Sequence, residues 1–169
     1  MIDIVPFFNK KHPFSNFYPA KFTVRGVTFP TSEHFFMYRK AERYSPSGGF
    51  KERILATSDP AEAKQIGRRI SNFDEKDWNT HSIEVMSTGI RNKFHQNPDL
   101  LKILLDTGDS ILVEASPYDR IWGCGISESD PRINDPSKWT GKNQLGKILM
   151  QVREEFKGIW ILSKDLSKL

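Results

Sequence analysis

An expected helix near the N-terminus carries a carboxylate and an amine on one side. Glu33 and Lys40 are seven positions apart, close to two helical turns, so their side chains point in directions that differ by only about 20°. Phe36 and Met37 lie between them on the same stripe. The first turn of a helix favours an ionised carboxylate, and apolar surroundings depress the pKa of an amine and make it a nucleophile. The alternative is a solvated face whose charges bond to neighbouring helices.

A second group of chemically suggestive residues follows Asp119, in the segment that continues through Trp122 and Gly123 to Gly125. An indole offers a flat face for stacking, and glycines let a ligand approach the backbone. Asp119 could then reach a ribose hydroxyl or the leaving group. The ordinary interpretation is a turn aspartate followed by a strand that contains glycines, and both interpretations stay open.

The segment from Gly141 to Lys147 matches most of a P-loop. Position 148 is isoleucine, so the hydroxyl that would bind magnesium is missing, which argues against a nucleoside triphosphatase. The start of the following helix could still accept an anion, assisted by Lys142, Asn143 and Lys147.

Composition narrows the class of protein. The 169 residues suit one domain, and 25 basic residues are interspersed with 21 acidic ones, so the net charge of +4 indicates only a mild preference for anionic ligands. Cys124 is the only cysteine, which excludes an intrachain disulfide and a multi-cysteine zinc site. The four histidines lack metal-ligand spacing, so neither a metal nor another cofactor is expected.

The chain has no apolar run near the ~18 residues that a membrane span needs, and no secretory signal. We therefore expect a cytoplasmic protein that does not contact membranes.

Hydrophobic periodicity and capping residues predict the elements that position these groups. The expected strands cover 2–8, 22–24, 27–29, 111–115 and 121–124. The expected helices, capping residues included, cover 31–44, 50–56, 59–70, 74–95, 97–108 and 143–156. In the longest helix, Ile83, Met86, Ile90 and Phe94 form the expected core stripe. This pattern predicts an α+β fold in which 1–169 form a mainly helical single domain around a small, mostly antiparallel sheet, with an uninformative tail over 158–169.

The order and number of these motifs resemble the NADAR (YbiA-like) family over about residues 5–156. The matching motifs are Phe14-Ser-Asn-Phe17, Thr31-Ser-Glu33-His34 with Lys40-Ala41, Gly67-Arg68 followed by Trp78, Met86, Lys93-Phe94, Leu104-Leu-Asp-Thr-Gly108, Leu112-Val-Glu-Ala-Ser116, Asp119-Arg-Ile-Trp-Gly123 and Trp139-Thr-Gly-Lys-Asn143-Gln-Leu-Gly146. One departure is the stretch Thr31 to Phe36, where many relatives have a tyrosine.

The resemblance implies a YbiA-like fold and hydrolysis of an N-glycosidic bond. It implies that Glu33 and Asp119 are the acidic active-site residues and that Lys40 can form a Schiff base with ribose. The implied substrate-binding residues are Asn16, Phe17, Arg68, Trp78, Lys93, Trp122, Gly123 and Asn143. From their residue types, Arg68, Arg69, Arg91 and Lys93 are also candidate phosphate contacts, with surface solvation as the alternative for each.

Three functions remain open. Some members of the family look like enzymes that cleave phosphoribosylamino-pyrimidine intermediates of riboflavin biosynthesis and release ribose 5-phosphate. Others remove ADP-ribose from guanine bases, which would make ADP-ribosylated nucleic acid a partner. The third function is a non-catalytic module that binds ADP-ribose or NAD, although such a module would not need Glu33, Lys40 and Asp119 together. The sequence predicts no oligomeric state.

Overall fold

In the computed structural model of the chain, residues 3–166 are described, with side chains described for residues 3–159. The chain folds into two compact units. The α1 unit consists of residues 16–98. The α6 unit consists of the residues up to Ser15 and those from Asp99 onward. That residues 1–169 form one domain stays a prediction.

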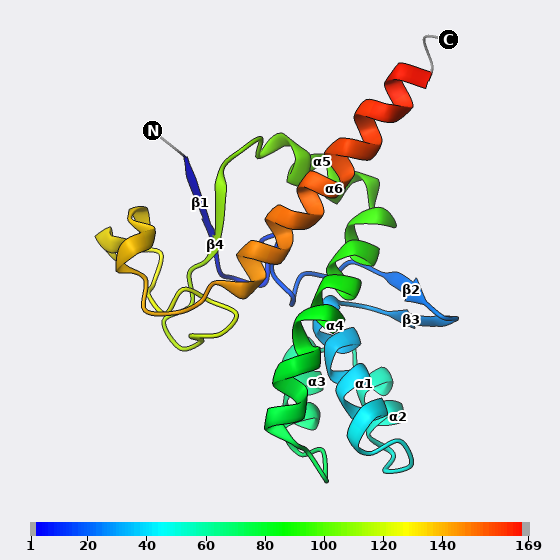
Figure 1. Cartoon of the computed structure of the whole chain (residues 1–169). Helices are drawn as coiled ribbons and strands as arrows, with labels where there is room; N and C mark the ends of the chain where they lie inside the picture. Colours follow the sequence, from blue (N-terminus) through cyan, green and yellow to red (C-terminus); the bar gives the residue numbers. More distant parts are fainter. Residues whose placement is uncertain (1–2, 167–169) are drawn as a thin grey trace. The chain divides into compact units, whose positions relative to one another are not determined.

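The central helix of the α1 unit is α1 (Ser32–Tyr44). It packs against α2 (Phe50–Ala56), α3 (Pro60–Arg68) and α4 (Glu75–His95), as Figure 1 shows. Its buried side chains point in several directions around the helix, which is why three helices can cover it. These side chains are Ser32, Glu33, His34, Phe35, Phe36, Met37 and Ala41.

The helices of the α1 unit begin at the predicted capping residues. Asp59 Oδ1 accepts a hydrogen bond of 2.9 Å from the N–H of Ala61, and Asp74 Oδ1 accepts one of 3.0 Å from the N–H of Asp77. Each contact satisfies a first-turn donor that has no partner within the helix. The predicted starts of α3 and α4 are therefore confirmed.

A β-hairpin precedes α1 and covers part of it. Strands β2 (Phe22–Val24) and β3 (Val27–Phe29) pair antiparallel, with Phe22 opposite Phe29. Arg25 and Gly26 form the turn with φ angles of 50° and 79°, the backbone that a tight two-residue hairpin needs. The rings of Phe29 and Phe35 pack edge to face at 5.2 Å, which joins the hairpin to α1. The predicted hairpin is confirmed.

The core stripe of α4 is confirmed at three of its four predicted positions. Met86, Ile90 and Phe94 are buried, whereas Ile83 is 45% exposed. The prediction for Ile83 is wrong because periodicity defines a face of the helix but does not show how far the covering elements extend along it.

The α6 unit is built on a parallel strand pair. Strand β1 (Ile4–Phe7) pairs with β4 (Ile111–Glu114), which follows α5 (Pro98–Asp106) in the chain. Helix α6 (Gln144–Leu166) packs against β4. The core beside these strands contains Val113, Ala115, Cys124, Ile126 and Ile133.

The mainly helical α+β class is confirmed, but the strands differ from the expected single, mostly antiparallel sheet. Within residues 3–166 they form two separate two-stranded sheets, of which β2–β3 is antiparallel and β1–β4 is parallel. The strand predicted over 121–124 is wrong, because the carbonyl groups of 121–123 accept hydrogen bonds from the start of α6 instead of from a strand.

The C-terminal part of the fold contains elements that the sequence did not predict. Two 3-10 helices, η1 (Pro131–Asn134) and η2 (Pro136–Lys138), precede α6. Helix α6 continues well beyond the predicted end at 156, so residues 158–166 of the expected tail are helical. Residues 167–169 of that tail lie outside the described part of the chain.

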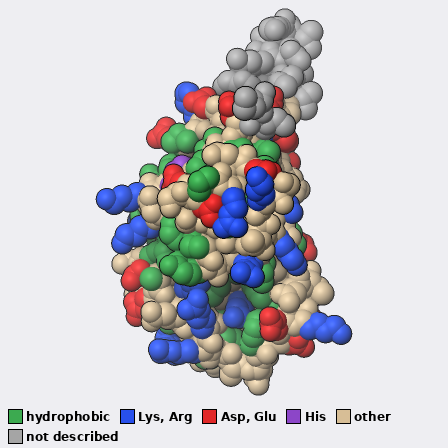
Figure 2. All heavy atoms as spheres, turned by 90° about the vertical axis from the view of Figure 1, so that its left-hand side faces the viewer, with side chains coloured by type: hydrophobic (Ala, Val, Ile, Leu, Met, Phe, Trp, Pro, Cys, Tyr) green, Lys and Arg blue, Asp and Glu red, His purple; other side chains and the backbone are tan. Residues whose placement is uncertain are grey.

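The last features of the fold are the distribution of charged side chains on the surface and the hydropathy of the helices. Figure 2 shows Lys and Arg side chains and Asp and Glu side chains interspersed over the face in view. None of the helices in the described part of the chain is long and apolar enough to span a bilayer.

Candidate active site

Glu33 is a buried carboxylate in the first turn of α1. Glu33 is only 5% exposed. Its backbone N–H donates a hydrogen bond of 3.0 Å to the carbonyl of Asn16. Thr31 caps the same turn by accepting a hydrogen bond from the N–H of His34. Because the start of a helix carries a partial positive charge, this position favours an ionised carboxylate.

Ser32, the residue directly before Glu33, holds Asn16 beside Glu33. The hydroxyl of Ser32 donates a hydrogen bond of 2.8 Å to Asn16 Oδ1, and Asn16 Nδ2 approaches the sulfur of Met86 at 3.5 Å. Both Ser32 and Asn16 are buried. The structure thus brings the predicted residue Asn16 next to Glu33.

Lys40 lies two turns after Glu33 and is half-buried. Its Nζ donates a hydrogen bond of 3.0 Å to the carbonyl of Gly67 and lies 3.8 Å from the centre of the Phe73 ring. Burial lowers the pKa of the Lys40 amine below its ordinary value, the positive charge of Arg68 lowers it further, and the negative charge of Glu33 opposes both effects. Glu33, Lys40 and Arg68 therefore interact electrostatically, and the amine is shifted toward its neutral, nucleophilic form.

Gly67 lets α3 approach α1 closely enough to make this contact. A Cβ atom at Gly67 would overlap the sulfur of Met37, so no larger residue fits without displacing that side chain. Met37 lies on the same side of α1 as Lys40. The glycine thus places its carbonyl within reach of the Lys40 amine.

His34 fastens the start of α1 to the connection between α2 and α3. Its ring is fully buried, with Nε2 3.0 Å from the carbonyl of Thr57 and Nδ1 2.8 Å from Oγ1 of Thr31. Because a carbonyl only accepts, Nε2 carries the hydrogen and Nδ1 accepts from the Thr31 hydroxyl. Burial lowers the pKa of His34, against smaller raising effects of Thr57 and Asp59. The sequence prediction missed this role, although the spacing of Thr31 and His34 suits such a contact.

Phe17 and Arg68 are accessible residues near this site. Arg68 is exposed at the end of α3, and the half-buried ring of Phe17 lies 5.7 Å from the amine of Lys64 on the same helix. Arg68 remains available to a phosphate, while a substrate contact of Phe17 stays a prediction.

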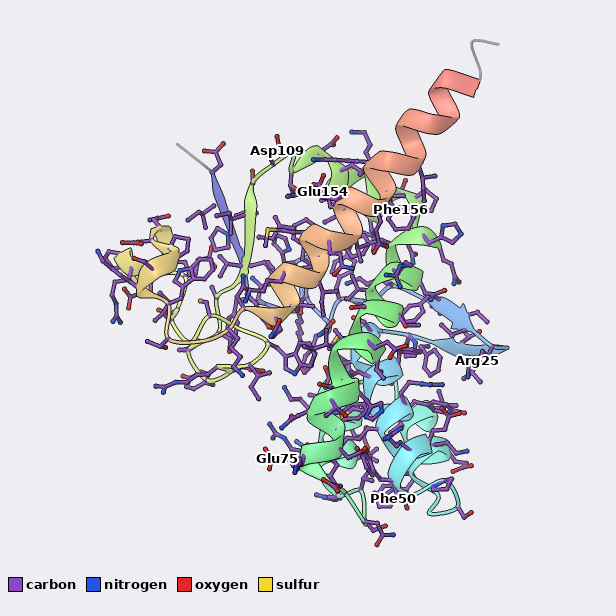
Figure 3. All side chains as sticks on the ribbon, in the orientation of Figure 1. Arg25, Phe50, Glu75, Asp109, Glu154 and Phe156 are labelled. Carbon is purple, nitrogen blue, oxygen red and sulfur yellow. The ribbon has the colours of Figure 1, made fainter. Side chains whose placement is uncertain are left out.

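The Trp78 ring packs against α1 at 5.0 Å from the Phe36 ring and 6.1 Å from the Tyr44 ring, two residues on the side of the helix that carries Glu33 and Lys40, and it also borders another side of α1. Positions 35, 39 and 42 of the helix point about 100–180° away from positions 33 and 40. On that side, Trp78, Phe35 and Arg39 line a cavity of about 440 Å³ whose other walls come from the β2–β3 hairpin and α4. Neither Glu33 nor Lys40 lines it. Figure 3 labels Arg25, another lining residue, at the turn of the hairpin.

Lys93 is fully buried in α4, so the alternative of surface solvation is wrong for this residue. Burial lowers the pKa of its amine to about 7. Its Nζ lies 5.8 Å from the ring centre of Tyr18. A phosphate contact of Lys93 stays a prediction.

In the α6 unit, Asp119 organises the loop in which it lies. Its Oδ1 accepts hydrogen bonds from the N–H groups of Ile121 at 2.9 Å and Trp122 at 2.8 Å. This contact confirms the predicted turn aspartate and fixes the direction of the carboxylate. Within residues 3–159, Oδ2 has no hydrogen bond to a side chain or to the backbone and remains available for chemistry.

The glycines of this loop allow protein groups to pack closely. A Cβ at Gly123 would lie 2.8 Å from the carbonyl oxygen of Asp119 and from the Cβ of Ser116, and a Cβ at Gly141 would overlap the carbonyl oxygen of Gly123. Gly123 is therefore required by loop packing, and its contact with substrate stays a prediction.

Asn143 uses its side chain within the fold. The amide accepts a hydrogen bond of 3.0 Å from the N–H of Glu114 and donates one of 2.9 Å to the carbonyl of Leu112. Asn143 is 2% exposed and has a φ of 49°. Its observed contacts position α6 on β4, whereas its predicted contact with substrate stays a prediction.

The start of α6 does not offer the anion site expected from the sequence. The backbone N–H groups of Lys142, Asn143, Gln144 and Leu145 donate to the carbonyls of Arg120, Gly123, Ile121 and Trp122, respectively. These donors are already used, so the expectation that the helix start accepts an anion is wrong.

Two remaining expectations concern cysteine and metals. Cys124 is a buried free thiol that donates a hydrogen bond to the carbonyl of Ile126. Burial raises the pKa of this thiol. Cys124 therefore packs as a small apolar residue, as expected. Within residues 3–166, no three His, Cys, Asp or Glu residues form a group that could hold a metal ion.

Eight of the eleven predicted site residues fall into two clusters. Asn16, Glu33, Lys40 and Arg68 gather around α1. Asp119, Trp122, Gly123 and Asn143 gather in the α6 unit, where the loop meets the start of α6. That both clusters line one cavity stays a prediction.

Comparisons with known proteins identify relatives over nearly the whole chain. The family model of the NADAR domain matches residues 6–157. "N-glycosidase R617" of Acanthamoeba polyphaga mimivirus is 41% identical over 150 residues, covering 85% of this chain and 87% of the relative. "Riboflavin biosynthesis protein VVA0006" of Vibrio vulnificus is 36% identical over 148 residues, covering 87% of this chain and 36% of that longer protein.

A solved structure supports the same relationship. The NMR structure of the Escherichia coli protein YbiA matches with a TM-score of 0.77 and 32% sequence identity, covering 95% of this chain and 89% of that chain. Sequence and fold agree with the predicted resemblance, and the chain belongs to the NADAR family.

Proposed function

We propose that the chain hydrolyses the bond between C1 of a phosphorylated ribose and the nitrogen of a pyrimidine-type base, and releases ribose 5-phosphate. In this proposal Glu33 and Asp119 are the acidic catalytic residues and Lys40 is the amine nucleophile. Asn16 and Arg68 bind the substrate beside Glu33 and Lys40.

The relatives support the reaction class. The chain is a hydrolase of N-glycosyl bonds, in agreement with its relatives that carry the name N-glycosidase. The relative from Vibrio vulnificus is named for riboflavin biosynthesis, which favours a phosphoribosylamino-pyrimidine as the substrate.

One observation carries the assignment of residues. A buried carboxylate and a half-buried amine interact on one side of α1, and the amine has a lowered pKa. Burial of such groups is costly, and paired titratable groups in shifted environments are typical of catalytic sites.

In the direct hydrolytic route, Glu33 acts on the sugar. Breaking the C1–N bond develops positive charge on the sugar and negative charge on the departing base. The Glu33 carboxylate stabilises the positive charge or activates the water that attacks C1. Asp119 orients the ribose hydroxyls or assists the departing base with its free oxygen. The water hydroxyl ends on C1, and its proton ends on the base nitrogen.

In the alternative route, Lys40 forms a covalent intermediate. The neutral amine attacks C1 of the opened sugar, the C1–N bond to the base breaks, and the base leaves with a proton. The resulting imine is hydrolysed by water, which releases ribose 5-phosphate and the free amine. The lowered pKa of Lys40 supports this route because it increases the neutral fraction of the amine.

The test compares the substrate classes directly. The protein is incubated with a phosphoribosylamino-pyrimidine, with an ADP-ribosylated guanine nucleotide and with ADP-ribose or NAD, and the released base is followed by chromatography. We expect release from the first substrate. Release only from the second would replace the proposal with an ADP-ribosyl hydrolase, and binding without turnover would replace it with a binding module.

Borohydride separates the two routes. In the imine route, substrate plus borohydride leaves a stable adduct on Lys40 and none on a Lys40→Arg variant. Turnover without any adduct would overturn the imine route and leave the hydrolytic one.

A further inference from the structure

We propose that Phe73 is a positioning residue for Lys40, whose ring holds the amine against the Gly67 carbonyl and controls how readily it loses its proton. This inference rests on the proposed function, because it gives Lys40 the role of nucleophile.

Two contacts define the place of the amine. The Lys40 Nζ lies 3.8 Å from the centre of the Phe73 ring and 3.0 Å from the carbonyl oxygen of Gly67. The face of an aromatic ring and a carbonyl oxygen are both electron-rich, so both attract the ammonium form. Together they hold a flexible four-carbon side chain in one arrangement, although an unrestrained lysine would sample many rotamers.

Other contacts keep Phe73 in its place. Its ring packs edge to face with Tyr44 at 5.3 Å, and Tyr44 is one helical turn after Lys40 on α1. The Tyr44 hydroxyl donates a hydrogen bond of 2.6 Å to Asp77 in the first turn of α4. Asn72, directly before Phe73, has a φ of 57°, which turns the chain before α4 begins. Phe73, a loop residue, is thus held by Tyr44 of α1, which is itself bonded to α4.

The ring has two opposite effects on the amine. Its electron-rich face stabilises the charged form, whereas its bulk keeps water away from the amine and destabilises that form. Phe73 is 39% exposed and its ring centre lies 3.8 Å from the amine, so a smaller side chain at this position would leave the amine more open to water. The charged groups that act on Lys40 are Arg68 of α3 and Glu33 of α1, and neither is changed when Phe73 is replaced.

Two substitutions separate these effects. Phe73→Leu keeps an apolar cover and removes the aromatic face, so the titration midpoint of the Lys40 amine should fall by about 0.5 pH unit. Phe73→Ala also admits water, so its midpoint should lie above that of Phe73→Leu. Phe73→Tyr keeps the ring and should restore the wild-type midpoint.

The midpoints are measured without substrate. The NMR signals of the lysine Cε and Nζ atoms are titrated in isotope-labelled full-length protein, and the Lys40 signals are assigned by their loss in Lys40→Arg. Phe8→Leu is the matched control, because Phe8 is 45% exposed and belongs to the α6 unit. It should leave the Lys40 midpoint unchanged. Identical midpoints in wild type, Phe73→Leu and Phe73→Ala would overturn the inference.

The reaction provides the second readout. The pH profile of base release and of borohydride trapping should move by the same amount as the Lys40 midpoint in each variant, and Phe73→Tyr should rescue it. A profile that stays fixed while the midpoint moves would overturn the positioning role. A wild-type protein that releases no base from any substrate class would instead overturn the proposed function, and the midpoints would still decide whether Phe73 controls the amine.

Discussion

Asn143 donates a hydrogen bond of 2.9 Å from its side chain to the carbonyl oxygen of Leu112, in the middle of β4. The same amide accepts a hydrogen bond from the N–H of Glu114, so a single buried side chain bonds to two residues of the strand. Gly146 makes this approach possible, since a Cβ there would overlap the Leu112 carbonyl. The start of α6 is thereby fixed on β4.

Replacing this amide should destabilise the protein. Asn143→Ala removes the hydrogen bonds to the N–H of Glu114 and to the carbonyl of Leu112, at a cost of about 1–3 kcal/mol for each buried group. Alanine also tolerates the φ of 49° poorly, which adds about 1 kcal/mol. The free energy of unfolding, measured with urea, should fall by about 3–7 kcal/mol.

Asn72 offers a matched control for this experiment. It has a φ of 57° but is exposed, and no side-chain hydrogen bond to it is present in residues 3–159. Asn72→Ala therefore costs only the backbone strain, about 1 kcal/mol. Equal losses in the two variants would show that the bonds to β4 contribute nothing.

Glu33→Gln tests the buried carboxylate. The substitution keeps the size of the side chain and removes its charge, so kcat/KM for base release should fall on the order of 10²-fold or more. Glu42→Gln is the control on the same helix, because its side chain is 43% exposed and pairs with Arg39 on the surface. Glu42→Gln should retain activity. Activity of Glu33→Gln within a few-fold of wild type would remove Glu33 from the mechanism.

His34 should make stability depend on pH. The folded state lowers the pKa of His34 below its unfolded value of 6.5, so the unfolded state binds the proton more readily. Stability is therefore complete above about pH 6.5 and falls as the pH drops toward the lower folded-state pKa. The slope from this one group is at most about 1.4 kcal/mol per pH unit.

Urea unfolding between about pH 8 and pH 5 measures this effect. The free energy of unfolding of wild type should decrease more steeply below pH 6.5 than that of His34→Gln, which has no imidazole. Parallel curves for the two proteins would contradict a buried, neutral His34.

Gly67→Ala should disturb the contact between α1 and α3. The added methyl overlaps the sulfur of Met37, and overpacking of this kind costs about 1–3 kcal/mol. Gly158→Ala is the matched control in α6, because a Cβ at that position has open space. It should stabilise the helix by up to about 1 kcal/mol. A stabilising effect of both substitutions, measured by urea unfolding, would show that Met37 moves aside freely.

The helices could be predicted from sequence because their signals are local. Asp59 and Asp74 accept hydrogen bonds from N–H groups two and three residues later, and a capping residue can be recognised within one turn. The pairing of β1 with β4 could not be predicted in the same way. It joins Ile4 to Ile111, and no local pattern specifies a partner at that distance in the chain.

In the candidate site, too, local relationships could be predicted from the sequence and contacts between distant elements could not. The spacing of Glu33 and Lys40 predicted that they share a side of α1, and the effect of Glu33 on the pKa of Lys40 agrees with it. The contacts of Lys40 with Gly67 and Phe73 come from other elements and could not be found by spacing. Lys93 shows a further limit, because residue type alone suggested solvation for an amine that is fully buried.

The hydrogen bonds that occupy the start of α6 have a consequence for how a phosphate is held. The N–H groups of residues 142–145 already donate to loop carbonyls, so under the proposed function we expect side-chain cations, and not these N–H groups, to hold the phosphate of the sugar. Arg68 is an exposed cation close enough to Lys40 to act on its amine, and we expect it to make this contact. Attraction between exposed charges is screened by dissolved salt over about 10 Å at 0.1 M. Affinity for the sugar phosphate is therefore expected to weaken as ionic strength rises, more than it would for a phosphate seated on the backbone of a helix.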